Sequence, residues 1–277
     1  MRNSFEHITL KASVLSLSLL FLAYPAQSQE SSASLIEEII VTSQRTEESL
    51  QDVPIAVTAL TSSMLEDMQI EGGSDLQLVT PSLSFQGSDA TGGAFNIRGI
   101  TNLAVSPTAE SGVEIHVNDM PVGATTMQDG DFLDMERIEV LRGPQGTLFG
   151  KNSVGGVINL ITAKPQFGEA FGSAGIDVGS YDLLKTKLML NIPLGESLAM
   201  RIAASSNDRD GDIKNIYSKA KTSHVNNRDS DAYRLSIAWN ASDRTDVLFV
   251  HENYSENSMR HYVNNVYCQR DPSFGSG

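Results

Sequence analysis

The residues most suggestive of chemistry are the glycines and the lysine of Gly146-Thr147-Leu148-Phe149-Gly150-Lys151-Asn152. A glycine-rich loop that ends in lysine can cradle phosphates with its backbone amides, and a Ser or Thr after the lysine then binds magnesium. That loop has a longer spacer between its glycines than this segment has, and here Asn152 follows the lysine. The spacing therefore argues against nucleotide binding, and we expect the glycines to serve a tight fold.

Nucleophiles and metal ligands also lack the arrangements that catalysis or metal binding requires. A serine hydrolase places its nucleophile in Gly-x-Ser-x-Gly, which neither Gly73-Ser74-Asp75 nor Gly87-Ser88-Asp89 matches. Cys268 is the single cysteine, so no internal disulfide or zinc-ligand pattern is formed. Four histidines are scattered and are expected in ordinary surface or loop positions, namely His116, His224, His251 and His261. The sequence predicts no enzyme, no metal and no cofactor, and a secreted hydrolase is the least favoured function.

The charge balance limits the partners of the chain. It has 34 acidic and 20 basic residues, which give a formal net charge of −14. Nucleic acids are bound through their phosphates by basic faces. We therefore expect no nucleic-acid partner.

The first 28 residues predict export. Arg2 and Lys11 precede an apolar run over residues 12–23, which is too short to span a bilayer and is typical of a secretory signal. Ala26-Gln27-Ser28 offers small residues at a cleavage site. We expect a signal peptide over residues 1–28 and a mature chain that begins near Gln29 in an envelope compartment.

Residues 52–165 alternate short strand and helix signals, which predicts a small α/β domain. Strand formers occupy residues 55–60, and Ser62 or Ser63 can cap a helix through Met68. Ser74 can cap a second helix, which ends before Pro81. Period-two alternation over residues 113–122, interrupted by an Asn-Asp turn, indicates a hairpin.

The end of this domain is the most regular part of the chain. Residues 137–141 favour a strand, and the turn chemistry of residues 143–146 follows directly. Gly155-Gly156 allows a close approach of backbones before residues 157–161 resume an extended run. We expect two neighbouring strands joined by a glycine turn.

Three segments together resemble the TonB-dependent outer-membrane receptors. They are SLQDVPIAVTAL at residues 49–60, FNIRGI at residues 95–100, and DMERIEVLRGPQGTLFGKNSVGGVINLITAKP at residues 134–165. The turn of the 113–122 hairpin departs slightly, because Asp119-Met120 stands where relatives often have Asp-Gly. The resemblance implies a plug domain over residues 49–165, a location in the outer membrane, and TonB-driven uptake of a scarce small ligand with no catalysed reaction.

The resemblance also implies a TonB box within a linker over residues 29–48. Ile39, Ile40, Val41 and Thr42 form a β-prone run after Glu38, and an exposed extended segment can add as a strand to a partner's sheet. We expect residues 37–45 to be flexible until TonB binds them. The alternative is an internal edge strand of the plug.

Four plug charges are candidates for contacts with a surrounding barrel, namely Arg98, Glu136, Arg137 and Arg142. Each can equally be a solvated surface charge. Inside a polar-lined barrel such residues could hold the plug through ion pairs and still let it move.

Beyond Pro165 the pattern changes to alternating strands. Apolar and polar residues alternate over residues 174–179, 184–192, 198–205 and 233–240. Each run has the length of a tilted membrane strand, with lipid on one face and the lumen on the other, although a soluble sandwich would alternate in the same way. Counting by twos places Leu188 toward lipid and Arg201 toward the lumen, where Arg201 could meet Glu136 or Glu139.

The connections favour the barrel. Residues 193–197 and 241–244 are short turns, whereas residues 207–230 form a long polar loop, as expected for periplasmic turns and outer loops. About five strands fit into residues 166–277, and a plugged transporter closes with about 22. The sequence thus predicts an α/β plug domain followed by the first antiparallel strands of a transmembrane β-barrel, an N-terminal fragment that lies in outer-membrane lipid. A signal-transducing receptor of the same family is disfavoured, because only a short linker precedes the box.

Overall fold

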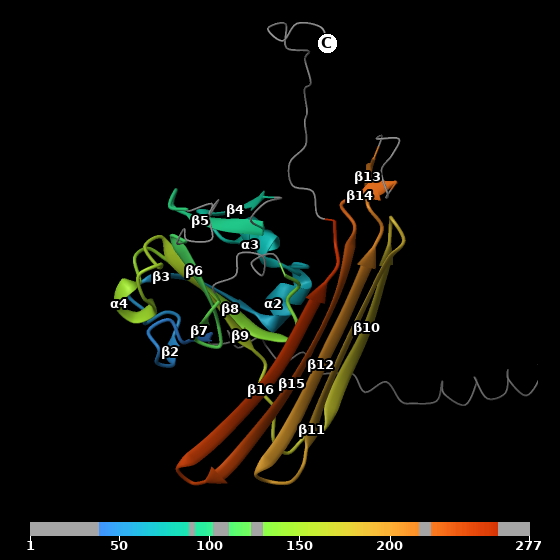
Figure 1. Cartoon of the computed structure of the whole chain (residues 1–277). Coiled ribbons are helices and arrows are strands. Elements are labelled where there is room, and N and C mark those ends of the chain that lie inside the picture. Colours follow the sequence, from blue (N-terminus) through green and yellow to red (C-terminus); the bar gives the residue numbers. More distant parts are fainter. Residues whose placement is uncertain (1–38, 89–91, 102–110, 123–129, 216–222, 260–277) are drawn as a thin grey trace, which may run out of the picture. The chain divides into compact units, whose positions relative to one another are not determined.

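The computed structural model describes residues 39–88, 92–101, 111–122, 130–215 and 223–259 (Figure 1). These residues all fall in one compact unit that begins at Ile39. The predicted signal peptide, the start of the linker, Glu38 and Cys268 lie outside the described residues. Among the helices that are described, none has the length and hydropathy to cross a membrane.

The plug is built on a five-stranded sheet. Its strands, in spatial order, are β3 (Ala56–Thr61), β8 (Met135–Arg142), β9 (Gly156–Thr162), β6 (Val113–Val117) and β7 (Met120–Pro121). Neighbours are antiparallel except for β6 and β9, which run parallel. The predicted strand pair at residues 137–141 and 157–161 is the centre of this sheet, where β-branched residues are buried on both faces.

One face of the plug sheet carries the apolar core. The elements that cover it are α2 (Ser62–Asp67), η2 (Gly73–Asp75), α3 (Leu76–Val79), β4 (Leu83–Ser88) and β5 (Gly92–Ile97). Leu65, Leu76 and Phe95 from these elements pack with Ile138 and Ile158 of the sheet. The cap of α2 differs from the expectation, because the Thr61 side chain, and not Ser62 or Ser63, accepts the Met64 amide.

The opposite face of the sheet buries polar side chains. Glu139, Asn159 and His116 lie in one row across β8, β9 and β6, and each is at most 1% exposed. The expectation of a surface position for His116 was therefore wrong. The ring of Phe149, from the short helix α4 (Gly146–Phe149), lies edge-on to His116 at 5.2 Å. The predicted glycine turn therefore contains a single turn of helix, which begins after Gln145.

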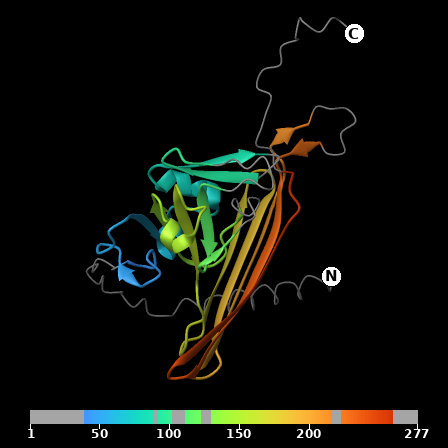
Figure 2. The same cartoon turned by 60° about the vertical axis from the view of Figure 1, so that its left-hand side comes forward.

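Five long antiparallel strands follow the plug and form a second sheet, called the wall below. In spatial and sequence order they are β10 (Phe171–Gly179), β11 (Leu183–Pro193), β12 (Leu198–Arg209), β15 (Arg228–Ser242) and β16 (Thr245–Glu256). They run side by side in both views (Figures 1 and 2). The number and order of strands predicted from alternation are confirmed.

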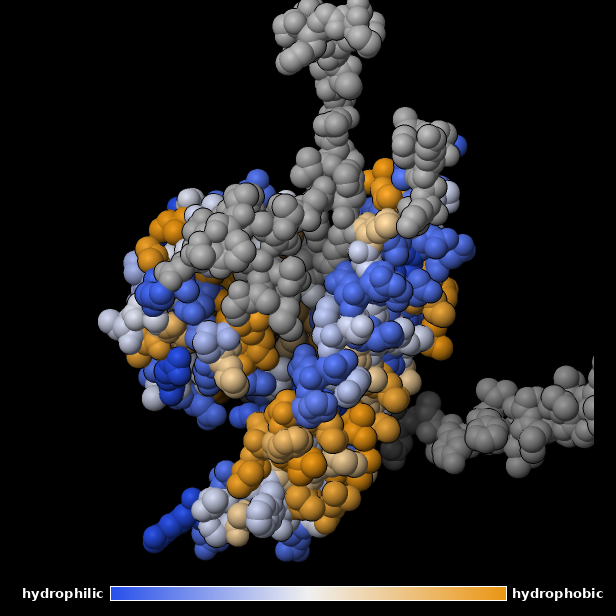
Figure 3. Space-filling view, in the orientation of Figure 1, coloured by the Kyte–Doolittle hydropathy of each residue, from blue (hydrophilic) through white to orange (hydrophobic). Residues whose placement is uncertain are grey.

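The two faces of the wall differ in chemistry. Leu188 pairs with Ala174 and Ala204, and this row continues to Tyr233 on the outer face. Leu188 is 43% exposed there, and hydrophobic residues gather on the lower part of the wall strands in Figure 3. Arg201 pairs with Asn191 and Ser236 on the other face, called the inner face below. The predicted assignment of Leu188 and Arg201 to opposite faces is confirmed.

The short turns between β11 and β12 and between β15 and β16, and the long connection between β12 and β15, lie where the sequence predicts them. The connection between β10 and β11 is also short. Tyr181 and Asp182 both have positive φ, of 61° and 53°, which is the geometry of a tight hairpin turn. Within the predicted long loop the structure contains a small hairpin, β13 (Ile213–Lys214) and β14 (His224–Val225). This hairpin lies at the end of the wall opposite the two short turns (Figure 1).

Candidate functional site

The plug is attached to the inner face of the wall through charged groups. Arg201 of β12 makes a bidentate contact with Asp134, with Nε–Oδ2 and Nη2–Oδ1 distances of 2.7 Å each. The two side chains are only 8% and 12% exposed. Charge-assisted pairs with two parallel hydrogen bonds are strong and orientation-specific, and poor access of water strengthens them. Asp134 therefore fixes the start of β8 to the wall.

A second arginine holds the main chain next to Asp134. Arg234 of β15 is 2% exposed and donates from Nη1 to the carbonyls of Leu133, at 2.6 Å, and of Asp134, at 3.3 Å. Its Nε donates to Glu252 directly opposite on β16, at 2.7 Å. The glutamate neutralises the buried guanidinium and leaves its other donors for the plug backbone.

Asp131 is the third attachment point. Its carboxylate accepts from Arg228 Nη2 at 2.9 Å, from Ser230 Oγ at 3.0 Å and from Asn207 Nδ2 at 3.3 Å. These donors come from the ends of β12 and β15. The segment from Asp131 to Asp134, called the strap below, is thus bound to two adjacent wall strands along its length.

Glu71 forms a separate, more open contact. Lys185 and Lys187, two residues apart on the inner face of β11, lie 2.8 and 3.0 Å from its carboxylate. Burial tends to raise the pKa of Glu71, but hydrogen bonds and attraction from the two ammonium groups outweigh it and hold the pKa below its ordinary value. Glu71 is therefore a carboxylate at neutral pH.

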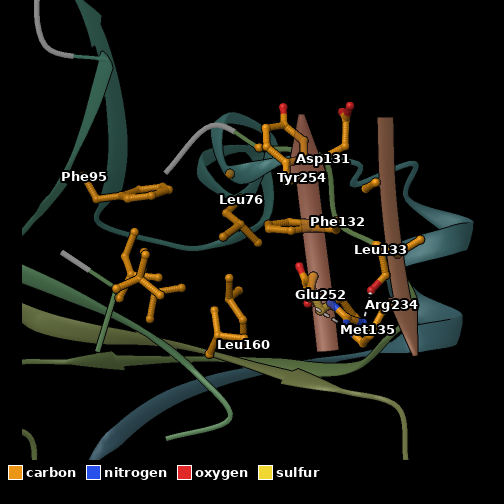
Figure 4. A pocket seen from close by; sticks show the side chains of 17 residues that line it. Leu76, Phe95, Asp131, Phe132, Leu133, Met135, Leu160, Arg234, Glu252 and Tyr254 are labelled. Carbon is orange, nitrogen blue, oxygen red and sulfur yellow. Dashed lines mark hydrogen bonds and ion pairs between the residues drawn. The ribbon is translucent and has the colours of Figure 1, made fainter. Parts of the chain in front are cut away.

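The plug–wall interface contains two cavities. One has a volume of about 80 Å³ and an apolar lining. In Figure 4, Leu76 and Phe132 project into it from the plug, and Arg234 and Glu252 enter it from the wall strands. The other, of about 310 Å³, is polar and is lined by Glu71, Asp131 and Arg228 among others. The interface is therefore mainly apolar beside Leu76 and Phe132 and polar beside Glu71.

The four plug charges predicted to face the barrel have other surroundings in the structure. Arg137 contacts Glu136 and, through Nε at 2.9 Å, Glu139, both within β8. Arg98 is exposed in a turn, with a positive φ of 55°. Arg142 is half-buried at the end of β8. Contacts of these residues with a barrel stay a prediction.

Sequence reasoning found the wall cations but not their plug partners. Lys185, Lys187, Arg201 and Arg234 all fall on the polar side of the alternation. The plug carboxylates Glu71, which pairs with both lysines, and Asp134, which pairs with Arg201, lie outside strands, where no periodicity marks a face. The same holds for Asp131, which pairs with Arg228. The available signal was that cations on the inner face of the wall need carboxylate partners on the plug. For Arg201 this partner is Asp134 and not Glu136 or Glu139.

The N-terminal segment, residues 39–45, has a partner inside the chain. Strand β1 (Ile40–Val41) pairs antiparallel with β2 (Glu48–Ser49), and the Ile39 carbonyl accepts from the Leu50 amide at 2.9 Å. Val41 is fully buried. The expected free, flexible segment is thus a docked strand over its described residues, since β2 pairs with one of its edges and Glu139 Oε1 accepts the Thr42 amide at 2.8 Å on the other.

The chain matches known proteins along most of its length. Residues 49–157 match the family model of the TonB-dependent receptor plug domain. The metal-pseudopaline receptor CntO of Pseudomonas aeruginosa is 27% identical over 209 residues, which cover 74% of this chain and 26% of that protein. The vitamin B12 transporter BtuB of Photobacterium profundum is 26% identical, over 73% of this chain and 33% of that protein.

Solved structures agree in fold. The ferric yersiniabactin uptake receptor FyuA from Yersinia pestis superposes with a TM-score of 0.62 at 24% identity, over 72% of this chain and 31% of that one. The pyoverdine outer membrane receptor FpvA from Pseudomonas aeruginosa gives 0.63 at 20%, over 77% and 29%. The chain spans about a quarter to a third of the length of these proteins. With its plug sheet and antiparallel wall strands, the chain thus resembles the TonB-dependent receptors: residues 49–157 match their plug domain, and the similar proteins include outer-membrane receptors and a transporter.

Proposed function

We propose that this protein takes up a scarce small ligand across the bacterial outer membrane, with TonB as its energy-supplying partner. The observation that supports the proposal best is the attachment of a plug with its own apolar core to the inner face of a strand wall through ion pairs and hydrogen bonds. A plug held only by close apolar packing would have to separate from the wall in one step, whereas ion pairs and hydrogen bonds can be exchanged for water one at a time. Such an attachment suits a gate.

In this proposal TonB binds Glu38, Ile39, Ile40, Val41 and Thr42 by strand addition. Main-chain hydrogen bonds would supply the affinity, as in other cases of β-augmentation. The docked segment is linked to β8, because the Thr42 amide donates to Glu139 Oε1 at 2.8 Å. Because β8 follows the strap directly, withdrawal of the segment by TonB would act on the same strand that continues from the attachment to the wall.

Ferric siderophores are the first ligand class to test, and other nutrients follow. The support comes from the relatives, which include receptors named for metal-pseudopaline, for ferripyoverdine and for pesticin, beside a vitamin B12 transporter.

The test is an uptake measurement in cells that lack their own siderophore receptors. Cells that produce the receptor are given isotopically labelled iron on a panel of siderophores, and labelled vitamin B12, with and without a protonophore. The proposal predicts that one ligand accumulates only while the proton gradient is intact, and that binding at the cell surface persists without it. Accumulation that persists in the presence of the protonophore and in a tonB deletion strain would contradict the TonB-driven mechanism.

A further inference from the structure

The polar face of the plug sheet holds a histidine and a glutamate that lie against each other without a hydrogen bond. His116 and Glu114 are two residues apart on β6, so their side chains lie on the same face of the strand. His116 Nε2 and Glu114 Oε2 are 3.5 Å apart, and the two side chains are only 2% and 15% exposed. Neither atom has a hydrogen-bond partner among the described residues. Such a buried, unpaired contact needs an explanation.

The tautomer of His116 follows from its other ring nitrogen. Nδ1 lies 3.1 Å from the main-chain carbonyl oxygen of Asp119. A carbonyl oxygen can only accept, so the hydrogen of this contact belongs to Nδ1. A neutral ring would then place the lone pair of Nε2 against a carboxylate oxygen, and two acceptors repel each other. The separation is too short for a water molecule to stand between the two atoms, whereas a proton fits.

The neutral neighbours of the pair that the structure describes donate no hydrogen bond to it. Asn159 lies beside His116 on β9, and both of its side-chain amide atoms are also buried without partners among the described residues. The ring of Phe149 lies edge-on to His116. A Cβ added at Gly150 would lie 3.8 Å from Glu114 Oε2, so the main chain at the end of α4 closes the site on that side.

The other carboxylates near the pair favour a positive ring. Glu139 lies in the same row beyond Asn159, and Arg137 Nε contacts it at 2.9 Å. Asp119, whose carbonyl accepts from His116, is exposed at the hairpin turn. Negative charge near an imidazole favours its protonated form.

Two cations lie on the elements that pack against this face. The guanidinium of Arg45 lies over the Phe149 ring at 5.0 Å and donates to the Leu148 carbonyl. Lys151 follows Gly150 and is exposed. Water screens an exposed ammonium group, so it balances a buried carboxylate only weakly. Among the described residues, His116 is the buried group that can match the charge of Glu114.

We propose that His116 and Glu114 form a buried proton-binding site, in which the proton stands on His116 Nε2 against Glu114 Oε2. The site is an imidazolium–carboxylate pair in a place with little water, where opposite charges attract more strongly than at the surface. It does not rest on the proposed transport function, because it needs neither a ligand nor TonB.

The proton acts on the hairpin of β6 and β7. The ring that carries it is hydrogen-bonded to Asp119 in the turn that joins these strands. Asn118 and Asp119 have positive φ of 48° and 66°, as in a tight two-residue turn. Loss of the proton leaves Glu114 as a buried carboxylate without a matching charge, which is strongly unfavourable. The hairpin is therefore held most firmly while the site is occupied.

The site makes plug stability depend on pH in a defined direction. An imidazole in the unfolded chain releases its proton at about pH 6.5, whereas the folded plug retains it. The contribution of the site is therefore fully present below that pH and is lost as the pH rises through the range in which the folded pair releases its proton. Across that window the equilibrium constant for plug unfolding should rise by up to about tenfold per pH unit. A neutral buried histidine would give the opposite sign, because the folded state would then bind fewer protons.

The test reads the proton on His116 in the receptor in isolated outer membranes. The C2 hydrogen of an imidazole exchanges with deuterium at a rate that depends on the protonation of the ring, so mass spectrometry of peptides yields a titration midpoint for each histidine. His224, which is exposed on β14, is the internal reference. The midpoint of His116 should lie at least about one pH unit above that of His224, a tenfold higher proton affinity. A midpoint at or below that of His224 would overturn the site.

Three variants assign the effect to the pair. Glu114→Gln keeps the size of the side chain and supplies an amide that can donate to a neutral Nε2. In this variant the midpoint of His116 should fall below that of His224, and the alkaline loss of plug stability should disappear. Glu66→Gln, at an exposed position of α2, and Lys151→Gln should leave the midpoint of His116 unchanged. A midpoint that Glu114→Gln does not move, or that Lys151→Gln moves as far, would contradict the proposal.

Discussion

At the scale of single residues, the strength of each contact between plug and wall depends on whether water can replace a lost hydrogen-bond donor to the carboxylate. Asp134 receives two hydrogen bonds from one guanidinium and is 12% exposed, so it has little water to replace a lost partner. Glu71 is 43% exposed and shares two lysines, so water can substitute there. We expect changes at Arg201 to be far more disruptive than changes at Lys187.

Arg201→Met should loosen the strap from the wall. Removal of one partner from a poorly exposed ion pair leaves an uncompensated carboxylate, which costs about 3–5 kcal/mol. The free energy of plug detachment can be followed in urea by protease cleavage in the plug. Asp134→Leu combined with Arg201→Met should recover part of the loss, because the double variant has no unpaired charge. An additive double variant would mean that the two residues act independently.

The contact of Glu71 should depend on pH. Its folded pKa lies below the ordinary value of 4.5, so its contribution is fully present above that value and is lost as the pH falls through the folded pKa. Plug attachment should therefore weaken in the acid range below pH 4.5. In Glu71→Gln the free energy of plug attachment should depend less on pH in this acid range and should not depend on pH near neutrality. An unchanged acid profile in Glu71→Gln would show that other carboxylates set it.

At the scale of elements, prediction from sequence succeeded where periodicity decides burial. Strands β8 and β9 of the plug and the five wall strands have one apolar face, or two, and their residue types fix which side is buried. It failed for β1, because its docking depends on Glu139, which is 97 residues away from Thr42. No local pattern can report such a contact. The strap was missed for the same reason.

The outer face of β11 offers a test of the register. Leu188 is exposed on the face that carries no plug contacts, with Tyr233 in the same row. In a bilayer Leu188→Arg should cost about 2–4 kcal/mol of barrel stability if the site lies near the midplane. Unfolding from lipid vesicles measures this loss, and Leu188→Phe is the control that keeps the face apolar. Tolerance of arginine equal to that of phenylalanine would place this face away from lipid.

At the scale of the whole molecule, the two sheets differ in how they are stabilised. The plug has its own apolar core, which joins Leu76, Ile97 and Ile138 among others, all fully buried. The wall exposes Ile176, Trp239 and Phe249 and lacks a second sheet over its outer face in the part of the chain that the structure describes. The first can fold in water, whereas the second needs another medium for its outer face.

Residues 49–165 should therefore fold alone as a soluble domain, and residues 166–277 should not. Three or more strands with a covered face are sufficient for independent stability, and a sheet with an uncovered apolar face aggregates. Both pieces can be produced separately and unfolded in urea. A wall piece that is soluble and unfolds cooperatively would mean that its apolar faces pack on each other and not on lipid.

The most direct test of the account is Ile40→Pro in the receptor. The Ile40 amide points away from β2, so proline there spares the bond between Ile39 and Leu50 and removes a donor from the edge that a partner strand needs. Energy-dependent uptake and ligand binding are measured side by side. The account predicts that binding is retained and uptake is lost. Unchanged energy-dependent uptake in Ile40→Pro would contradict the claim that this segment receives TonB as an added strand.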